Sequence, residues 1–360
     1  MKHILIFLLG LTNLTLSAQN NDIWTLFWNS DTTLFGYKDK NGTVKIEPKF
    51  TMVFADKFNH IIAVTKEVNS QWDSYYLTKS GKIVGRDSLY FFDNGFDCEN
   101  EGFIRFRDHK IDKAGLFNKN GDIVIPAEYD DLTGVRNGMF IALKGAKKEY
   151  WDDSREHYSW VGGQEMLIDT LNRVLIDRFP YATNLNFYSI QKTKTPPLDT
   201  IREFFPAKDG SYYSFINFEK EFKQWLTTDL LSNLTAEKLI KASFDTITWA
   251  SIEDWEKSDS RQFITNNFDM LKKGLQEILN PDCNYFISMD GLNSYIYEGT
   301  EFEKYFNDCG ETKEWIYPVM AIIVSHKNKK DFTQNHYEFL RTDNGYKLIS
   351  ITVRNEKIND

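Results

Sequence analysis

The chain has 360 residues, with 43 Lys and Arg against 52 Asp and Glu, and its formal net charge is therefore −9. An acidic chain repels phosphate backbones and anionic lipid surfaces, so nucleic acid and anionic membranes are not expected partners. Aromatic residues make up 15% of the chain, enough to fill the cores of the two domains that this length favours.

Residues 1–18 have the three features of a cleaved secretory signal. Lys2 supplies a positive start, Ile4–Leu11 is an apolar run, and Ser17-Ala18 gives a small-residue cleavage site before Gln19. The run is too short to span a bilayer, and no later stretch reads as membrane-spanning. We therefore expect an exported protein, periplasmic or extracellular, with no integral membrane segment after cleavage. Its net charge would then be −10, because the signal contains Lys2 and no acidic residue.

The three cysteines are Cys98, Cys283 and Cys309, too few for a disulfide scaffold. Export to an oxidising compartment allows a Cys283–Cys309 bridge with Cys98 left over. The alternative is that all three are free and buried. No CxxC or Cys/His spacing indicates a metal site.

A short polar turn recurs four times in the first half of the chain. The four segments are Asp39-Lys40-Asn41-Gly42, Thr78-Lys79-Ser80-Gly81, Asn118-Lys119-Asn120-Gly121 and Asp169-Thr170-Leu171-Asn172. Each lies between aromatic or aliphatic residues, which predicts a β-hairpin. The last residue is Gly or Asn, which best tolerate the positive φ that ends such a turn. Repetition at this period predicts copies of one supersecondary unit.

The copies continue to match beyond the turn. Phe50 and Tyr129 each lie eight residues after the turn glycine, and Pro48 and Pro126 precede them. Proline cannot donate to a ladder, so we expect it to end the strand. A further apolar run follows each hairpin, so each unit is predicted to be a hairpin plus one following strand, about 40 residues long.

The segments Gly36–Phe50 and Gly115–Asp130 resemble a WG repeat, also called KWG. Phe35-Gly36 and Ala114-Gly115 stand where that family has Trp-Gly. The resemblance covers about residues 30–190, with two good copies and two degenerate ones. It implies a β-rich fold, found mostly in bacterial proteins, with no activity of its own.

About eleven extra residues before the fourth turn fall within Lys144–Gly163. This insertion carries Tyr150, Trp151, Tyr158 and Trp160 among charged residues. Insertions in repeat arrays map to loops, and loops often carry binding, so these four side chains are the candidate binding residues. The alternative is an extended hairpin whose aromatic rings pack against neighbouring residues.

The pattern changes near Thr193–Pro197, so we predict a β domain over residues 19–195 and a second domain over residues 196–360. Apolar spacing predicts helices around Phe218–Leu230 and Ile264–Ile278. Strands are expected within Trp315–Ser325, His336–Leu340 and Tyr346–Val353. Helices followed by an antiparallel sheet predict an α+β fold. This layout is similar to that of nuclear-transport-factor-like domains.

No common catalytic motif is present in the chain. His326 and His336 are predicted to face one another across a hairpin turning at Lys329–Asp331, with Glu338 beside them, as an acid–base or metal pair. The alternative for these histidines is a solvated strand face. Asp130-Asp131 and Asp152-Asp153 are expected to be solvated loop carboxylates, because no calcium-loop spacing accompanies them. No cofactor or metal is expected.

Two functional hypotheses follow from these patterns. The first is an exported, non-catalytic binding or interaction module with a protein or small-molecule partner, since repeats without a catalytic constellation build contact surfaces. The second is a C-terminal hydrolase or isomerase that uses His326, His336 or Glu338.

Overall fold

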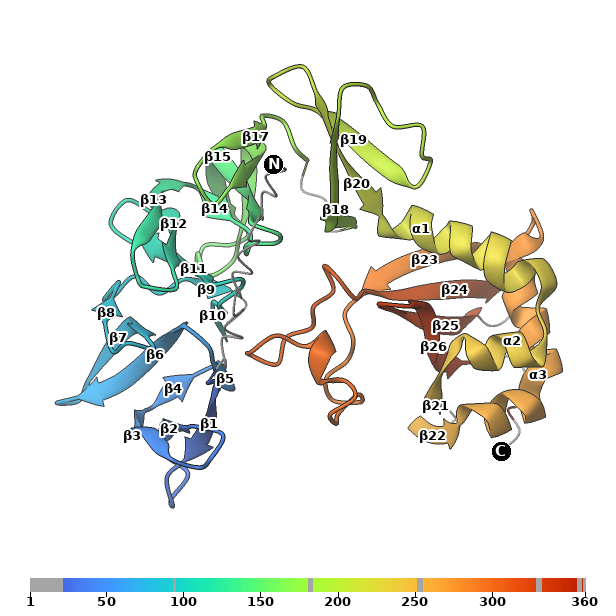
Figure 1. Cartoon of the computed structure of the whole chain (residues 1–360), viewed down its shortest axis with the longest axis horizontal. Helices are drawn as coiled ribbons and strands as arrows, with labels where there is room; N and C mark the ends of the chain where they lie inside the picture. Colours follow the sequence, from blue (N-terminus) through green and yellow to red (C-terminus); the bar gives the residue numbers. More distant parts are fainter. Residues whose placement is uncertain are drawn as a thin grey trace, which may run out of the picture.

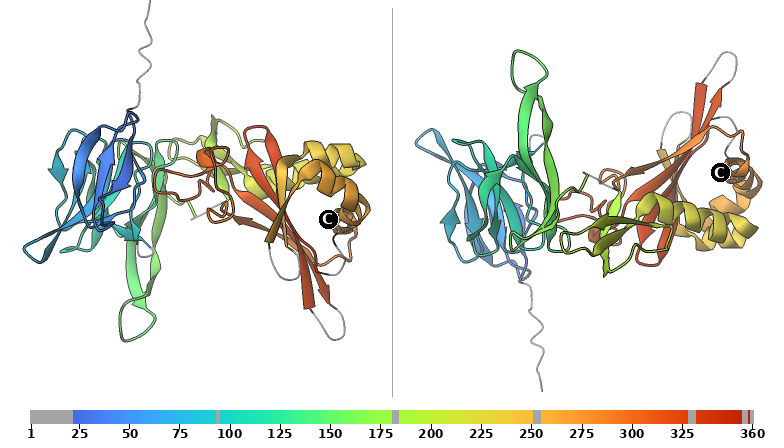
Figure 2. Two further views of the ribbon diagram at one scale, coloured as in Figure 1. Left: turned by 90° about the horizontal axis from the view of Figure 1, so that it is seen from below. Right: turned by 90° about the horizontal axis from the view of Figure 1, so that it is seen from above.

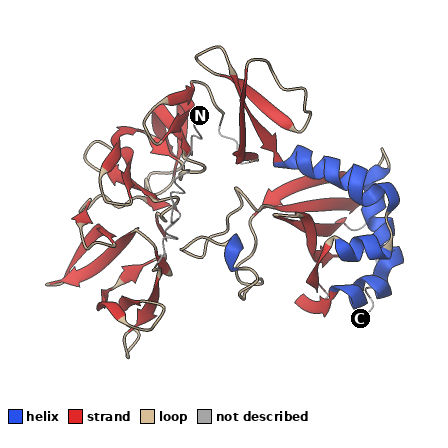
Figure 3. Cartoon of the chain, in the orientation of Figure 1, coloured by secondary structure: helices blue, strands red, loops and turns tan. Residues whose placement is uncertain are grey.

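The computed structural model describes residues 22–92, 95–180, 184–250, 255–327, 332–354 and 358. The expected signal at residues 1–18 lies outside them. Small sheets follow one another along an arc in the first part of the chain, and a larger sheet with helices forms the rest (Figure 1). Helices occur only after residue 217 in the described part (Figure 3).

Five small antiparallel sheets make up the arc, accompanied by the short pair β9 (Phe91–Phe92) and β10 (Gly95–Phe96). The first contains β1 (Trp24–Trp28), β2 (Phe35–Lys38), β3 (Val44–Phe50) and β5 (Lys57–Phe58). The second contains β4 (Met52–Val53), β6 (Ile61–Val68), β7 (Gln71–Thr78) and β8 (Ile83–Val84). The third contains β11 (Phe103–Asp108), β12 (Lys113–Asn118) and β13 (Ile123–Tyr129). The fourth contains β14 (Asp131–Leu132), β15 (Met139–Tyr150), β16 (Tyr158–Asp169) and β17 (Val174–Ile176). The fifth contains β18 (Leu185–Thr193), β19 (Arg202–Pro206) and β20 (Tyr212–Asn217).

The repeat unit begins at a different strand from the predicted one. The strand expected to follow each hairpin pairs instead with the next hairpin, as β6 does with β7. Asn69 and Ser70 connect these two strands with φ of +52° and +61°, a mirror-image turn that matches the strand twist. Each of the first four sheets therefore contains one strand followed by its own hairpin.

The four repeated turns have the same geometry, as predicted. Gly42, Gly81, Gly121 and Asn172 have φ of +82°, +87°, +70° and +60°. In each turn the N–H of this residue donates to the carbonyl of the first turn residue over 2.8–2.9 Å. The first side chain also accepts from the N–H four residues later, at 2.9–3.0 Å. This second bond explains why Asp, Asn or Thr stands at the first position.

The glycine before each good hairpin permits a close approach of two strands. A Cβ on Gly36 would lie 2.5 Å from the carbonyl oxygen of Ile46, and one on Gly115 would lie 2.5 Å from that of Ile125. The register shifts at both places, and β3 and β13 run on through their prolines. The expectation that Pro48 and Pro126 end the strands is therefore wrong, because the bulge removes the need for a proline donor.

The second, third and fourth sheets each bury both of their faces in two successive cores, whereas the first and the fifth contribute to one core each. In β6, Ile62 and Val64 join a core with Tyr37 of the first sheet, whereas the alternate residues Ile61 and Ala63 join a core with the third sheet. The third and fourth sheets share the next core. The fourth and fifth share the last, which contains Phe187 and Phe215. Strand alternation thus places successive side chains in successive cores.

The predicted boundary between residues 195 and 196 falls inside the fifth sheet. β18 pairs with β20, from Leu185↔Asn217 to Thr193↔Tyr212. Residues 202–217, expected to begin a helical region, form two strands, and Phe215 packs in the core of the arc. Strand pairing therefore carries the N-terminal unit as far as residue 217.

The last part of the chain is built on one six-stranded sheet in the order β22-β21-β26-β25-β24-β23. Its strands are β21 (Ser243–Ala250), β22 (Trp255–Asp259), β23 (Tyr285–Asp290), β24 (Val319–Lys327), β25 (Phe332–Thr342) and β26 (Gly345–Thr352). The sheet differs from the predicted one in two ways. Two of its strands precede α3, and β21 runs parallel to β26, so the sheet is mixed.

The helices pack on one face of this sheet. They are α1 (Phe218–Gln224), the π-helical η1 (Trp225–Leu230), the short η2 (Leu231–Asn233), α2 (Ala236–Lys241), α3 (Ser260–Gln276) and η3 (Glu277–Leu279). Asn217, Thr235 and Asp259 cap the three α-helices through their side chains. Phe222 and Leu271 of the helices share a core with Tyr337 and Phe339 of β25.

A long connection between β23 and β24, residues 291–317, links the two parts and is called the bridging segment here. It contains one short helix, η4 (Glu303–Tyr305), and reaches the inner side of the arc (Figure 1). Lys57 donates its N–H to the Asp308 carbonyl at 3.1 Å and pairs with Glu303 at 3.0 Å. Arg136 lies over the Trp315 ring, 4.8 Å from its centroid.

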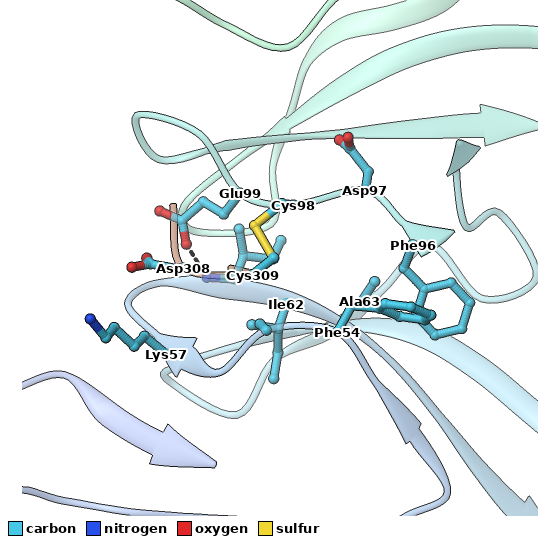
Figure 4. Close-up of a pocket in the computed structure, with 12 residues that line it drawn as sticks. Phe54, Lys57, Ile62, Ala63, Phe96, Asp97, Cys98, Glu99, Asp308 and Cys309 are labelled. Carbon is cyan, nitrogen blue, oxygen red and sulfur yellow. Dashed lines mark hydrogen bonds between the residues drawn. A yellow bond between two sulfur atoms is a disulfide. The ribbon is translucent and has the colours of Figure 1, made fainter. Parts of the chain in front are cut away.

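A disulfide joins the bridging segment to the arc. It connects Cys98 to Cys309, which are 211 residues apart, and leaves Cys283 free (Figure 4). Both predicted alternatives, a Cys283–Cys309 bridge and three free thiols, are wrong. The prediction paired the two cysteines nearest in sequence, whereas the bridging segment folds back onto the arc and packs Cys309 against the core of the first and second sheets. The cavity beside the disulfide measures about 10 Å³, room for a single water at most.

The turn glycines provide a stability test. Gly42 has φ +82°, and a Cβ added to it would have no neighbouring atom within 4 Å, so a substitution there acts on the backbone alone. We expect Gly42→Val to lower the free energy of unfolding of the arc by about 1–2 kcal/mol. Gly42→Asn should stay close to the wild type, because Asn occupies the equivalent position in the fourth turn. Urea unfolding followed by tryptophan fluorescence checks both, and equal midpoints for the two variants would contradict the assignment.

Candidate functional site

A cleft of about 390 Å³ lies where the third and fourth sheets meet the bridging segment. Its walls come from three parts of the chain: Tyr90 and Arg105 on one side, the β14–β16 region on another, and Glu314 of the bridging segment. Ligand pockets usually have volumes of about 300–1,000 Å³. The cleft therefore has the size of a small-molecule site.

A buried ion pair supports one wall. Arg105 donates to the Asp97 carboxylate at 2.5 and 3.0 Å and to the Leu132 carbonyl at 2.7 Å. Its guanidinium stacks over the Tyr90 ring, 4.2 Å from the centroid. Burial acts to lower the pKa of Arg105, but Asp97 holds it above its ordinary value, so the group stays charged.

Asp131 connects this wall to the β15–β16 hairpin, which carries Trp160. Its carboxylate accepts hydrogen bonds from the Tyr90 hydroxyl at 2.5 Å, from Arg107 at 3.3 Å and from the Trp160 indole at 3.1 Å. The Leu132 N–H donates to it as well, at 3.0 Å. Because four donors already surround this carboxylate, it holds the neighbouring segments together and is not available to bind a ligand.

The neighbouring Asp130 is more deeply buried, only 3% exposed. It accepts from the Ala146 N–H at 2.8 Å and pairs with Lys113. The expectation that Asp130-Asp131 form a solvated loop is therefore wrong. The local sequence is polar, and only the packing of the hairpin against the third sheet buries Asp130 and partly covers Asp131.

The insertion forms the outer half of the β15–β16 hairpin, which projects from the body (Figure 2). Gly145, Gly162 and Gly163 interrupt the strands with φ of +81°, +71° and +81°. A Cβ on Gly163 would lie 2.7 Å from the Ala146 nitrogen, so no other residue fits there. Trp160 and Glu165 would face opposite sides of a regular strand, yet both line the cleft. These glycines account for the change of face.

The structure brings three of the four predicted binding residues together. Tyr158 contacts Tyr150 and Trp160 edge-on, at centroid distances of 5.9 and 5.4 Å. Lys148 lies over the Tyr158 ring at 4.3 Å and pairs with Asp112. Of the four predicted binding residues, Trp160 is the one that lines the cleft.

Trp151, the fourth predicted residue, lies apart near the hairpin tip. It is 69% exposed, and its indole donates to the Ser159 hydroxyl at 2.8 Å. The binding role of all four residues stays a prediction. Arg105, Asp131, Arg136, Glu165 and Glu314 were missed, since no motif marks residues that come from separate segments.

The C-terminal sheet separates the three residues that were predicted as a catalytic alternative. His326 lies on the helical face, where it contacts Asn335 at 3.2 Å and Glu277 at 3.7 Å. His336 and Glu338 lie on the opposite face, and His336 pairs with Ile323 rather than with His326. The two histidines therefore do not face one another. Their turn at 328–331 lies outside the described residues.

Burial shifts both groups on that opposite face. It lowers the pKa of His336, with a smaller effect from Arg354, and it raises the pKa of Glu338. Each shift favours the neutral form of the group. His326 is not on the same side of the sheet as these two groups, and the hydrolase or isomerase hypothesis stays a prediction.

Neither a metal centre nor a membrane-spanning helix is found among the described residues. They contain no group of three or more His, Cys, Asp or Glu side chains placed to hold a metal ion. In the same part of the chain, no helix combines the length and the apolar composition needed to cross a bilayer.

The Arg105–Asp97 pair can be tested by substitution. Asp97→Asn leaves a buried guanidinium without its counter-charge, and we expect the free energy of unfolding to fall by about 3–5 kcal/mol. The control is Asp122→Asn, which removes an exposed partner of Lys82 and should leave the urea midpoint nearly unchanged. Similar midpoints for the two variants would show that the buried pair does not support the wall.

The comparisons with known proteins agree with the repeat architecture. A family model described as WG containing repeat matches residues 35–62 and 115–147, which include the segments Gly36–Phe50 and Gly115–Asp130. No curated protein and no solved structure shows significant similarity to the chain. The similarity of the C-terminal part to nuclear-transport-factor-like domains is not among these matches and stays a prediction. Two regions in the N-terminal half of this chain thus match the WG-containing repeat.

Proposed function

We propose that the chain is an exported, non-catalytic binding module of a bacterial cell envelope or of the space outside the cell, and that the cleft is its ligand site. The observation that carries this proposal is the cleft itself. It has a ligand-sized volume of about 390 Å³, and its walls come from two repeat sheets and the bridging segment. Repeat arrays use such composite surfaces for recognition.

Two features support export. The first is the expected signal at residues 1–18, and the second is the Cys98–Cys309 disulfide. Disulfides persist mainly in oxidising compartments such as the periplasm and the cell exterior. A reducing cytoplasm would leave the bridging segment without this covalent attachment.

The C-terminal part has a supporting role in this proposal. We propose that residues after 217 form an α+β unit, similar in layout to nuclear-transport-factor-like domains. Its sheet holds both ends of the bridging segment, and Arg341 of β25 donates to the Ile316 carbonyl at 3.0 Å. The unit thereby positions Glu314 at the cleft.

Export predicts the covalent state of the mature protein. The chain recovered from the exported fraction of its bacterial host should begin at Gln19 and contain one disulfide, as measured by intact mass. Alkylation in denaturant without reductant should modify only Cys283. A chain that keeps residues 1–18, or one with three reactive thiols, would contradict export to an oxidising compartment.

Filling the cleft with a larger side chain should weaken the binding of an apolar probe there. N-phenyl-1-naphthylamine is a neutral probe whose fluorescence rises in apolar surroundings. We expect Leu143→Trp to weaken its saturable binding at least about tenfold, because the larger ring occupies the cleft and overfills it. The control is Leu171→Trp in the fourth turn, where the side chain is 71% exposed. Equal binding by the two variants would exclude the cleft as the site.

A further inference from the structure

Within the part of the chain that the structure describes, Glu314 is the charged group of the cleft that has no partner. Among the described residues its carboxylate forms no hydrogen bond or ion pair. The other charged residues that line the cleft all have partners, and they are Arg105, Asp131, Arg136 and Glu165. A ligand that enters the cleft therefore meets one uncompensated negative charge.

The backbone on both sides of Glu314 is held in place. Lys313 donates its N–H to the Tyr305 carbonyl at 2.8 Å. On the other side, Trp315 lies against Arg136, and the Ile316 carbonyl accepts from Arg341. Glu314 is thus presented from a braced segment, although the segment has little regular structure. Because the backbone is braced, only the side chain of Glu314 has to be ordered when a ligand binds.

The interior of the cleft is apolar beside this charge. Leu132 and Ile141 are 3% and 5% exposed and form part of the lining. Leu143 lies between Asp131 and Glu165 in the cross-strand register, and Trp160 closes the side. An alkyl chain can lie on these residues while a polar group stays at the rim.

The charges favour a cation over an anion. Two positive and three negative side chains line the cleft, and the whole chain carries a net charge of −9. Both the local and the long-range field therefore attract cations. The guanidinium of Arg105 is already neutralised by Asp97, so it is not available to an anionic ligand.

We propose that the cleft binds an aliphatic ammonium group on an apolar stem, as in a free alkylamine or a lysine side chain. The ammonium lies at Glu314 and the stem lies along Leu143 and Trp160. This inference rests on the proposed function of the cleft as a ligand site. It adds the chemical class of the ligand.

Calorimetric titration of the mature full-length chain tests the class. n-Hexylamine is a cation at pH 7, as lysine is, and it should bind more tightly than hexan-1-ol, while hexanoate should not bind. Shortening the stem to n-butylamine should weaken binding by up to about fifteenfold, since each buried methylene contributes roughly a factor of four. Acetyl-Gly-Lys-Gly-amide distinguishes the two sources: its binding indicates a lysine side chain, and its exclusion indicates a free amine.

Matched variants test the role of Glu314. Glu314→Gln should weaken n-hexylamine binding about three- to fivefold, as expected for a partly exposed ion pair. Glu301→Gln removes the same charge from the same segment outside the cleft lining and should leave binding unchanged. Unchanged thermal melting shows that both variants are folded. Equal affinity of the two variants, or binding of hexanoate as tight as that of n-hexylamine, overturns the proposal.

The two proposals fail in different ways. If N-phenyl-1-naphthylamine binding is lost in Leu143→Trp but no amine binds the wild type, the cleft is a ligand site and the ammonium class is wrong. If Leu143→Trp affects no probe, the cleft is not a ligand site, and both proposals fall together.

Discussion

The structure of the N-terminal part depends on one constraint, which is that the second, third and fourth sheets must each bury both of their faces. Neighbouring strand residues such as Ile61 and Ile62 fill different cores, one shared with the preceding sheet and one with the next. No sheet has a core of its own, so a unit of about 40 residues gains its stability only from its neighbours. The same constraint extends the array to residue 217, because the fourth sheet needs Phe187 and Phe215 to cover its outer face.

This stacking places polar residues from distant positions at one point. Arg105 on β11, Asp131 on β14 and Trp160 on β16 come together because successive sheets pack face to face. Trp160 donates to Asp131, and Arg105 donates to Asp97 and to the Leu132 carbonyl. These hydrogen bonds satisfy groups that would be costly to bury alone. The bridging segment completes the cleft, held by the Cys98–Cys309 disulfide at one place and by Arg136 and Arg341 around Glu314. The cleft therefore belongs to the assembly of repeats and segment, and no single repeat contains it.

Turn conformations and helix spacing were predictable from the sequence, because they depend on residues close together in the chain. The positive φ at Gly42, Gly81, Gly121 and Asn172 follows from residue type and turn spacing, and the apolar spacing of α3 follows from the helical period. The phase of the repeat was not predictable, since an apolar strand pairs equally well with the hairpin before it or after it until the cores are formed. The face of the sheet on which His326 lies was not predictable either, because the register between β24 and β25 depends on the whole sheet.

The amino-acid sequence alone determined the four repeated turns and their shape, the acidic charge and the two matched repeats, because these follow from residue types and from spacings within one repeat. Tertiary structure decided which cysteines pair, which aspartates are buried, where the N-terminal unit ends and which side chains line the cleft. All of these depend on contacts between segments up to 211 residues apart. Such contacts form only when the sheets have stacked on one another, and a linear pattern of residue types does not contain that information.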